Sequence, residues 1–145
     1  MEKNGTFFRL ESSKLRYATK ALLYLAERGG GRNVATREIA KEQAIPEKYL
    51  ELIVGELRAA GILDSVKGKH GGYRLGREPS AIRLLDLVAT LEGSSLSETE
   101  SEGNDPEPAI WTDLNREVTR LLEETTLADA LMAEDRRRGV LNYSI

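Results

Sequence analysis

Residues 46–75 read PEKYLELIVGELRAAGILDSVKGKHGGYRL, and this stretch decides the fold. The apolar residues of its first half fall at helical spacing; they are Leu50, Ile53, Val54 and Leu57. This spacing predicts an amphipathic helix from Pro46 to Ala60, which Gly61 then ends. Residues 62–66 have the pattern of a strand, a glycine-rich turn follows over 67–72, and residues 73–75 return as a second strand. A hairpin directly after such a helix is the wing of a winged helix-turn-helix.

Two further helices are predicted before this stretch, over residues 12–27 and 36–43. In the first, leucine and alanine recur every three or four positions, a serine pair can cap the start, and three glycines follow the end. Only Ala44 and Ile45 separate the second helix from the third. That short connection is typical of the turn in a helix-turn-helix.

The sequence after the hairpin indicates that the chain is organised in three parts. Residues 84–91 form a fourth helix, which completes a domain over residues 1–93. Residues 94–108 carry five carboxylates and no basic residue, a composition with too little apolar surface to order itself, so we expect a mobile loop. Residues 109–145 are expected to hold a dimerisation helix and a C-terminal tail.

The predicted helix over residues 109–124 has a broad apolar stripe that no other predicted segment covers. The stripe consists of Ile110, Trp111, Leu114, Val118, Leu121 and Leu122. The simplest cover is the same helix of a second chain, so we expect a homodimer. Thr126 and Asp129 then fit a capping box that starts a short last helix.

The composition excludes several classes of protein. A length of 145 residues indicates one domain, with or without an appendage. The chain has no cysteine and one histidine, His70, which disfavours disulfides, thiolate chemistry and metal sites. It shows no nucleophile–base pair, so we expect neither an enzyme nor a bound cofactor. Neither a signal peptide nor an apolar run near the roughly 20 residues of a membrane span is present, which predicts a cytoplasmic protein.

Charge is distributed unevenly along the chain. Residues 1–83 hold 16 basic and 10 acidic residues, a balance of +6, whereas residues 84–145 hold 5 and 14, a balance of −9. This asymmetry favours contact between the first part and a polyanion. A charge-balanced dimer would show the same asymmetry.

Three segments resemble the Rrf2 family of winged-helix transcription regulators. They are SKLRYA at 13–18, residues 45–51 continuing into 57–63 and the wing at 65–75, and Trp111 followed by TLAD at 126–129. Together they span most of residues 8–132, although the family usually has glycine where this chain has Leu15. The resemblance implies a mainly α fold, a winged helix-turn-helix with a long C-terminal dimerisation helix. It also implies sequence-specific binding of double-stranded DNA by a homodimer at a near-palindromic operator, most often for repression.

The chain departs from the family between the fourth helix and the dimerisation helix. Members that hold an iron–sulfur cluster keep three cysteines there, often with a histidine. Here Asp105 and Pro108 stand roughly where the last cysteine and the histidine would be. Because such clusters need thiolates, we expect regulation without one. Two signals stay open: a protein partner such as a cysteine-biosynthetic enzyme, which some family members use, or a small molecule bound between the domains.

The third helix supplies the first candidate DNA-binding residues. In helix-turn-helix proteins the first turn of this helix enters the major groove. The resemblance implies base-edge or phosphate contacts by Lys48, Tyr49 and Glu51, and a glutamate can accept a hydrogen bond from cytosine N4. The alternative is that Tyr49 packs on the first helix while Glu51 pairs with a neighbouring cation.

Cations of the wing and the first helix complete the candidate DNA-binding set. Lys67 matches the position of a minor-groove cation in the family, and Lys69 and His70 follow it on the same loop. By resemblance Lys14 anchors a phosphate, whereas Arg16 either joins it or is only solvated. For the wing the alternative is a solvated hairpin tip, and the sequence lacks the GxxxxGK[ST] motif of a nucleotide-binding loop.

Overall fold

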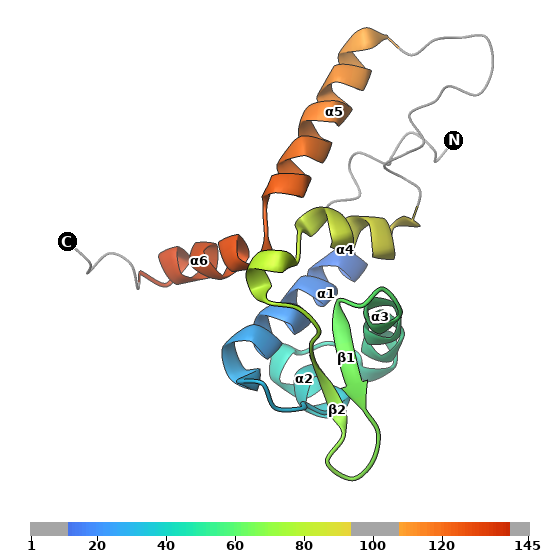
Figure 1. Cartoon of the computed structure of the whole chain (residues 1–145), viewed down its shortest axis with the longest axis vertical. Coiled ribbons are helices and arrows are strands. Elements are labelled where there is room, and N and C mark those ends of the chain that lie inside the picture. The colour runs from blue at the N-terminus through green and yellow to red at the C-terminus, as the bar shows by residue number, and fades with distance from the viewer. Residues whose placement is uncertain (1–11, 94–107, 140–145) are drawn as a thin grey trace.

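The computed structural model describes residues 12–93 and 108–139. Figure 1 shows a helical body from which a hairpin and one long helix project. The helices are α1 (Ser13–Tyr24), α2 (Thr36–Gln43), α3 (Glu47–Ala59), α4 (Leu84–Leu91), α5 (Ala109–Glu124) and α6 (Leu127–Arg137), with short turns η2 (Leu25–Gly29) and η3 (Pro79–Ala81). The strands β1 (Leu63–Val66) and β2 (Gly72–Leu75) form one antiparallel pair. The predicted fold class, mainly α with a winged helix-turn-helix, is confirmed.

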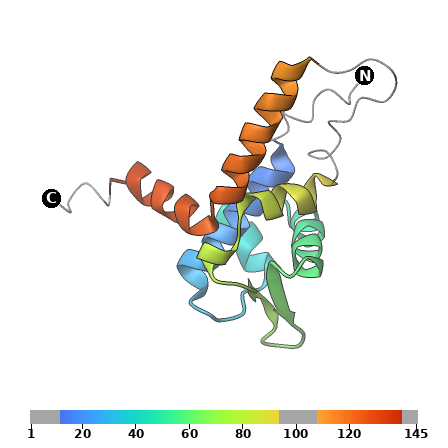
Figure 2. The same cartoon turned by 45° about the horizontal axis from the view of Figure 1, so that its top comes forward.

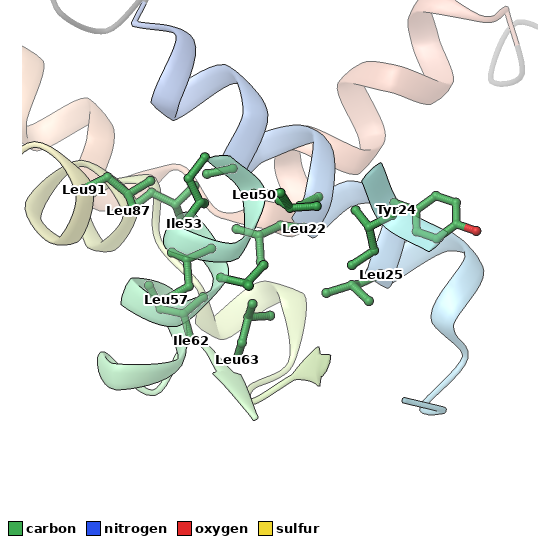
Figure 3. Close-up of a cluster of buried hydrophobic side chains, with 14 of the residues drawn as sticks. Leu22, Tyr24, Leu25, Leu50, Ile53, Leu57, Ile62, Leu63, Leu87 and Leu91 are labelled. Atoms are coloured by element: carbon green, nitrogen blue, oxygen red, sulfur yellow. The ribbon is translucent and has the colours of Figure 1, made fainter. Parts of the chain in front are cut away.

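The hydrophobic core lies where α1, α2, α3 and α4 meet (Figure 3). All four predicted apolar residues of α3 are fully buried in it; they are Leu50, Ile53, Val54 and Leu57. Leu22 of α1, Ile39 of α2 and Ile62 before the first strand are also fully buried. The helical spacing of the apolar residues therefore turns one face of each helix towards the same core.

The first helix differs from its prediction at the C-terminal end. Ser12 is the N-cap, and its hydroxyl accepts a hydrogen bond from the amide of Leu15 at 3.1 Å. The predicted helix over 12–27 ends as regular α-helix at Tyr24 and continues as the π-helical turn η2. Gly30, at φ 57°, then reverses the chain. Apolar spacing misses this turn because a wider turn still places Leu25 in the core.

The connection between α2 and α3 is the tight turn of the helix-turn-helix. Ala44 takes a left-handed conformation, with φ 55°, and directs the buried side chain of Ile45 into the core. Pro46 is the N-cap of α3 and not its first helical residue, one position from the prediction. The connection between α2 and α3 is therefore three residues long, one more than predicted, and it keeps the two helices in contact.

The backbone segment between α1 and α2 attaches the wing to the body. Leu63 pairs with Leu75 and Val66 with Gly72 across the hairpin. Val34, between α1 and α2, exchanges two 2.8 Å backbone hydrogen bonds with Tyr73. The hairpin thus leaves the body as part of a small three-segment sheet, which holds its base in position.

Helix α5 projects from the body, but its C-terminal end is fixed to it (Figures 1 and 2). Thr126 forms a backbone bridge with Arg83, and the amide of Leu127 donates to the carbonyl of Ile82 at 2.8 Å. The predicted capping box of Thr126 and Asp129 is present and starts α6. Leu127 is fully buried, so the segment after residue 109 packs on the core of the preceding domain.

Part of the predicted organisation lies outside the described residues. Of the acidic segment 94–108, the structure describes only Pro108, which is the N-cap of α5. The division into 1–93, 94–108 and 109–145 therefore stays a prediction.

The last helix reaches Arg137 over 11 residues and is longer than the short helix expected. Among the described helices, none combines the length and hydropathy that a membrane span requires.

Candidate nucleic-acid interface

The outward face of α3 carries a mixture of charge and apolar surface. Lys48, Glu51 and Leu52 are all exposed. Within residues 12–93 and 108–139, neither Lys48 nor Glu51 forms an ion pair, so the predicted alternative of a paired Glu51 finds no partner there. This leaves an unpaired carboxylate and ammonium group on the helix that precedes the wing.

Tyr49 is positioned differently from its neighbours on α3. Its half-buried ring packs edge-on against Tyr17 of α1, with ring centroids 5.5 Å apart and planes at 88°. Such edge-to-face pairs stabilise packing beyond the area they bury. The contact favours the alternative in which Tyr49 braces α3 against α1, and a base contact by Tyr49 stays a prediction.

The tip of the wing presents three exposed side chains. Lys67, Lys69 and His70 lie between the two strands, and in the described chain neither lysine forms an ion pair. Gly71 is required by the hairpin itself, because a Cβ there would lie 2.1 Å from the carbonyl oxygen of Val66. Gly72 is required by the contact between the hairpin and the segment before α2, because a Cβ there would lie 2.5 Å from the carbonyl oxygen of Val34. These two glycines therefore build the wing, and they give no evidence of close approach to a phosphate.

The two predicted cations of α1 lie in different surroundings. Lys14 pairs with Glu56 of α3 at 3.1 Å, which places its ammonium group beside this helix. Arg16 lines a pocket between α1, α2 and α6. The structure therefore brings Lys14, but not Arg16, to the elements that carry the other candidate DNA-binding residues.

A polar network fixes α2 against the end of α1. The Tyr24 hydroxyl donates to Glu38 at 2.6 Å, and Arg32 pairs with the same carboxylate at 2.8 Å. The Arg32 and Tyr24 hydrogen bonds lower the pKa of Glu38, and the bond to Glu38 raises the pKa of Tyr24. In Figure 3 the Tyr24 ring lies at the edge of the core with its hydroxyl pointing away from it. The network thus anchors the helix against which α3 packs.

The apolar stripe of α5 splits into a covered part and an exposed part. Leu122 is half-buried against the core, and Val118 is also half-buried. The other four stripe residues remain 40–57% exposed; they are Ile110, Trp111, Leu114 and Leu121. No residue of α5 is buried. Among the residues that the structure describes, those of the body therefore cover only the C-terminal end of the helix.

The pocket beside Arg16 has a volume of about 750 Å³. Lys20 and Arg28 also line it and, like Arg16, form no ion pair in the described part of the chain, while Arg138 reaches across from α6 to Glu27 at 2.8 Å. It is therefore an open, predominantly basic pocket between the first helix and the C-terminal one.

The residues present do not fit an iron–sulfur cluster. Such clusters are held by cysteine thiolates, and the sequence contains no cysteine. Across the two described segments, no three histidine or acidic side chains come together in a way that could hold a metal ion. Asp105, which stands near the position of a family cysteine, lies outside them, whereas Pro108 has no side-chain donor.

Leu52 and Gly55 of α3 are functional candidates that the sequence reasoning missed. Leu52 is 65% exposed although the other large aliphatic residues of the helix are fully buried. Gly55 lies in mid-helix, where a Cβ would meet nothing within 4 Å. The available signals were an apolar residue outside the helical stripe and a glycine inside a helix.

Known proteins similar to this chain are transcription regulators. Residues 11–133 match the Rrf2 model, described as an iron-dependent transcriptional regulator. The chain is 38% identical over 121 residues to the HTH-type transcriptional regulator CymR of Bacillus subtilis, which covers 81% of this chain and 86% of the relative. It is 33% identical over 137 residues to IscR of Cereibacter sphaeroides, covering 86% and 88%. The solved structure of CymR, described as the global cysteine regulator of B. subtilis, matches with a TM-score of 0.72 and 36% identity over 84% of this chain and 95% of that one.

Proposed function

Because this chain belongs to the Rrf2 family and is a DNA-binding transcription regulator, we propose that it represses transcription as a homodimer on a near-palindromic operator, without an iron–sulfur cluster. The observation that carries the proposal is the charge on the outward face of α3 and on the wing, which forms no ion pair among the described residues. The wing lies beside α3 (Figure 1). A recognition helix in the major groove and a wing along the adjacent backbone would use both surfaces at once.

The two surfaces have different tasks in this proposal. Glu51 has no hydrogen-bond or ion-pair partner among residues 12–93 and 108–139, so its carboxylate would accept a hydrogen bond from cytosine N4 and discriminate a base pair. Lys67 and Lys69 at the wing tip, and Lys14 beside α3, supply positive charge for phosphates or groove edges. Phosphate contacts position the protein, whereas base contacts give specificity.

Gel-shift titrations at several salt concentrations test this division. Lys67→Ala should weaken binding to all sequences alike and lower the salt slope by about one charge. Glu51→Ala should keep the slope but relax preference at one position per half-site, by roughly 1–3 kcal/mol. If Glu51→Ala leaves base preference intact, the assigned role of Glu51 is wrong.

Wild-type binding should survive a metal chelator, since no thiolate holds a cluster.

The dimer in this proposal forms through α5. Four large apolar side chains on one helix are exposed, and an isologous contact between two copies of the helix would cover all of them. Helix α5 carries four acidic and two basic residues, and it projects from the body that holds α3 and the wing (Figure 1). A dimer built through α5 would therefore leave both recognition helices free for two half-sites.

Regulation by a small molecule is a second candidate, and the pocket between α1 and α6 favours it. Three cations that line it, Arg16, Lys20 and Arg28, form no ion pair with a described residue and suit an anionic metabolite. Thermal stabilisation of the purified protein by such a metabolite would support this signal. Co-purification with a cysteine-biosynthetic enzyme would instead support regulation through a protein partner.

A further inference from the structure

Leu52 has no role in the fold that would explain a large apolar side chain. It is 65% exposed, more than any other large hydrophobic residue that the structure describes. Its neighbours on the helix surface, Lys48 one turn before and Glu51 beside it, are charged and exposed. Leu52 therefore lies on the face that the proposed function turns towards DNA, opposite the buried stripe of α3.

Gly55, three residues after Leu52, is equally unexplained by the chain itself. Glycine is among the least favourable residues inside a helix. Gly55 has ordinary helical geometry, and a Cβ there would meet nothing within 4 Å. At Gly71 and Gly72, in contrast, a Cβ would collide with the protein's own backbone. The missing side chain at Gly55 therefore leaves room for something outside the chain.

We propose that Leu52 packs against the C5-methyl group of a thymine in each operator half-site, and that Gly55 lets the helix approach the groove closely enough for this contact. The proposal rests on the proposed DNA-binding function. The thymine methyl is the apolar group that the base edges of the major groove present. One leucine surrounded by charged side chains and a glycine is too small a patch for a protein interface, but it matches the size of a methyl group.

Replacing thymine with deoxyuridine tests the contact, because the exchange removes only the methyl group. The operator is first selected from random DNA by wild-type protein, and each thymine of a half-site is then replaced in turn. At one position the wild type should lose roughly fourfold in affinity per half-site, the equivalent of one buried methyl-sized group. Leu52→Ala should bind the thymine and deoxyuridine operators equally well. Met132→Ala, which trims a similarly exposed side chain on α6, should discriminate like the wild type.

Gly55→Ala gives a second test, in which the stability of the free protein and its affinity for the operator should change in opposite directions. The change should raise the thermal midpoint of the free protein, because alanine favours a helix more than glycine does. The same change should weaken operator binding several-fold, because the new methyl group occupies the space of close approach. Unchanged operator affinity in Gly55→Ala, with the higher midpoint, would overturn the role given to Gly55.

The outcomes separate this proposal from the function on which it rests. If no DNA sequence is enriched by the wild type, the proposed operator binding fails, and the thymine contact fails with it. If an operator is enriched but no deoxyuridine exchange weakens binding, DNA binding stands and the thymine contact is wrong. A change of oligomeric state in Leu52→Ala would assign the residue to a protein contact and would also overturn the proposal.

Discussion

Helices α3 and α5 have similar apolar stripes and opposite surroundings. The four stripe residues of α3 are fully buried inside their own chain, whereas α5 has no buried residue and leaves Trp111 52% exposed. Apolar surface removed from water stabilises a protein wherever the cover comes from. The comparison therefore shows that periodicity identifies a surface needing cover, while the fold decides whether the same chain supplies it.

The largest effect is expected from shortening a buried side chain in the apolar stripe of α3. Leu57→Ala should lower the free energy of unfolding by about 2–5 kcal/mol, since a fully buried leucine leaves a cavity behind. Urea denaturation followed by circular dichroism measures it. The loss should be the same at every protein concentration. A loss that disappeared on dilution would mean that α3 depends on a second chain, as we propose for α5.

A smaller, concentration-dependent effect is expected from the matched change on α5. Leu121 is 53% exposed, so Leu121→Ala should change the stability of the single chain little and should weaken the proposed dimer by about 1 kcal/mol per copy. Sedimentation equilibrium measures the dissociation constant. The chain has one tryptophan, Trp111, so its fluorescence reports the same interface on dilution. Unaltered dimerisation would place the contact elsewhere.

The smallest effect is expected from the polar contacts at the edge of the covered core. Hydrogen bonds from Arg32 and Tyr24 hold the pKa of Glu38 below its usual 4.5. The stability that they contribute is present above pH 4.5 and is lost as the pH falls through the lowered value. Glu38→Gln should therefore reduce the thermal midpoint slightly at pH 7, by at most about 5 °C.

The pH dependence provides the control for this change. The difference between Glu38→Gln and wild type should narrow as the pH falls below 4.5, because the wild-type carboxylate then becomes neutral as well. A difference that is constant over this range would show that the charge on Glu38 does not stabilise the contact between α1 and α2.

Regular periodicity allowed most helices to be predicted. The bounds of α2, α4 and α5 agree with the prediction because each apolar face begins and ends with its helix. The π-helical turn after Tyr24 and the left-handed Ala44 could not be foreseen, since both depend on how the chain closes over the core. The bridge between Val34 and Tyr73 joins residues far apart in sequence, and no local pattern predicts it.

The sequence predicted which helix and hairpin form the candidate site better than it predicted where their individual side chains lie. The recognition helix and the wing follow from the order of helix, glycine and hairpin. The positions of individual side chains depend on what packs beside them: Tyr49 contacts Tyr17, and Arg16 lies on a different side from the pair formed by Lys14 and Glu56. Leu52 was overlooked because an apolar residue in an amphipathic helix is readily assigned to the core.

Because α5 is attached to the body at Thr126 and Leu127, the helix would rotate as a rigid unit about this end, which acts as its pivot. Its 16 residues span about 24 Å, so a rotation of about 10° at the pivot would move the far end by roughly 4 Å over that length. In the proposed dimer this displacement would change the distance between the two recognition helices by more than a base contact tolerates. The stiffness of the contacts that hold residues 125–127 to the body would thus set the operator spacing that the dimer accepts.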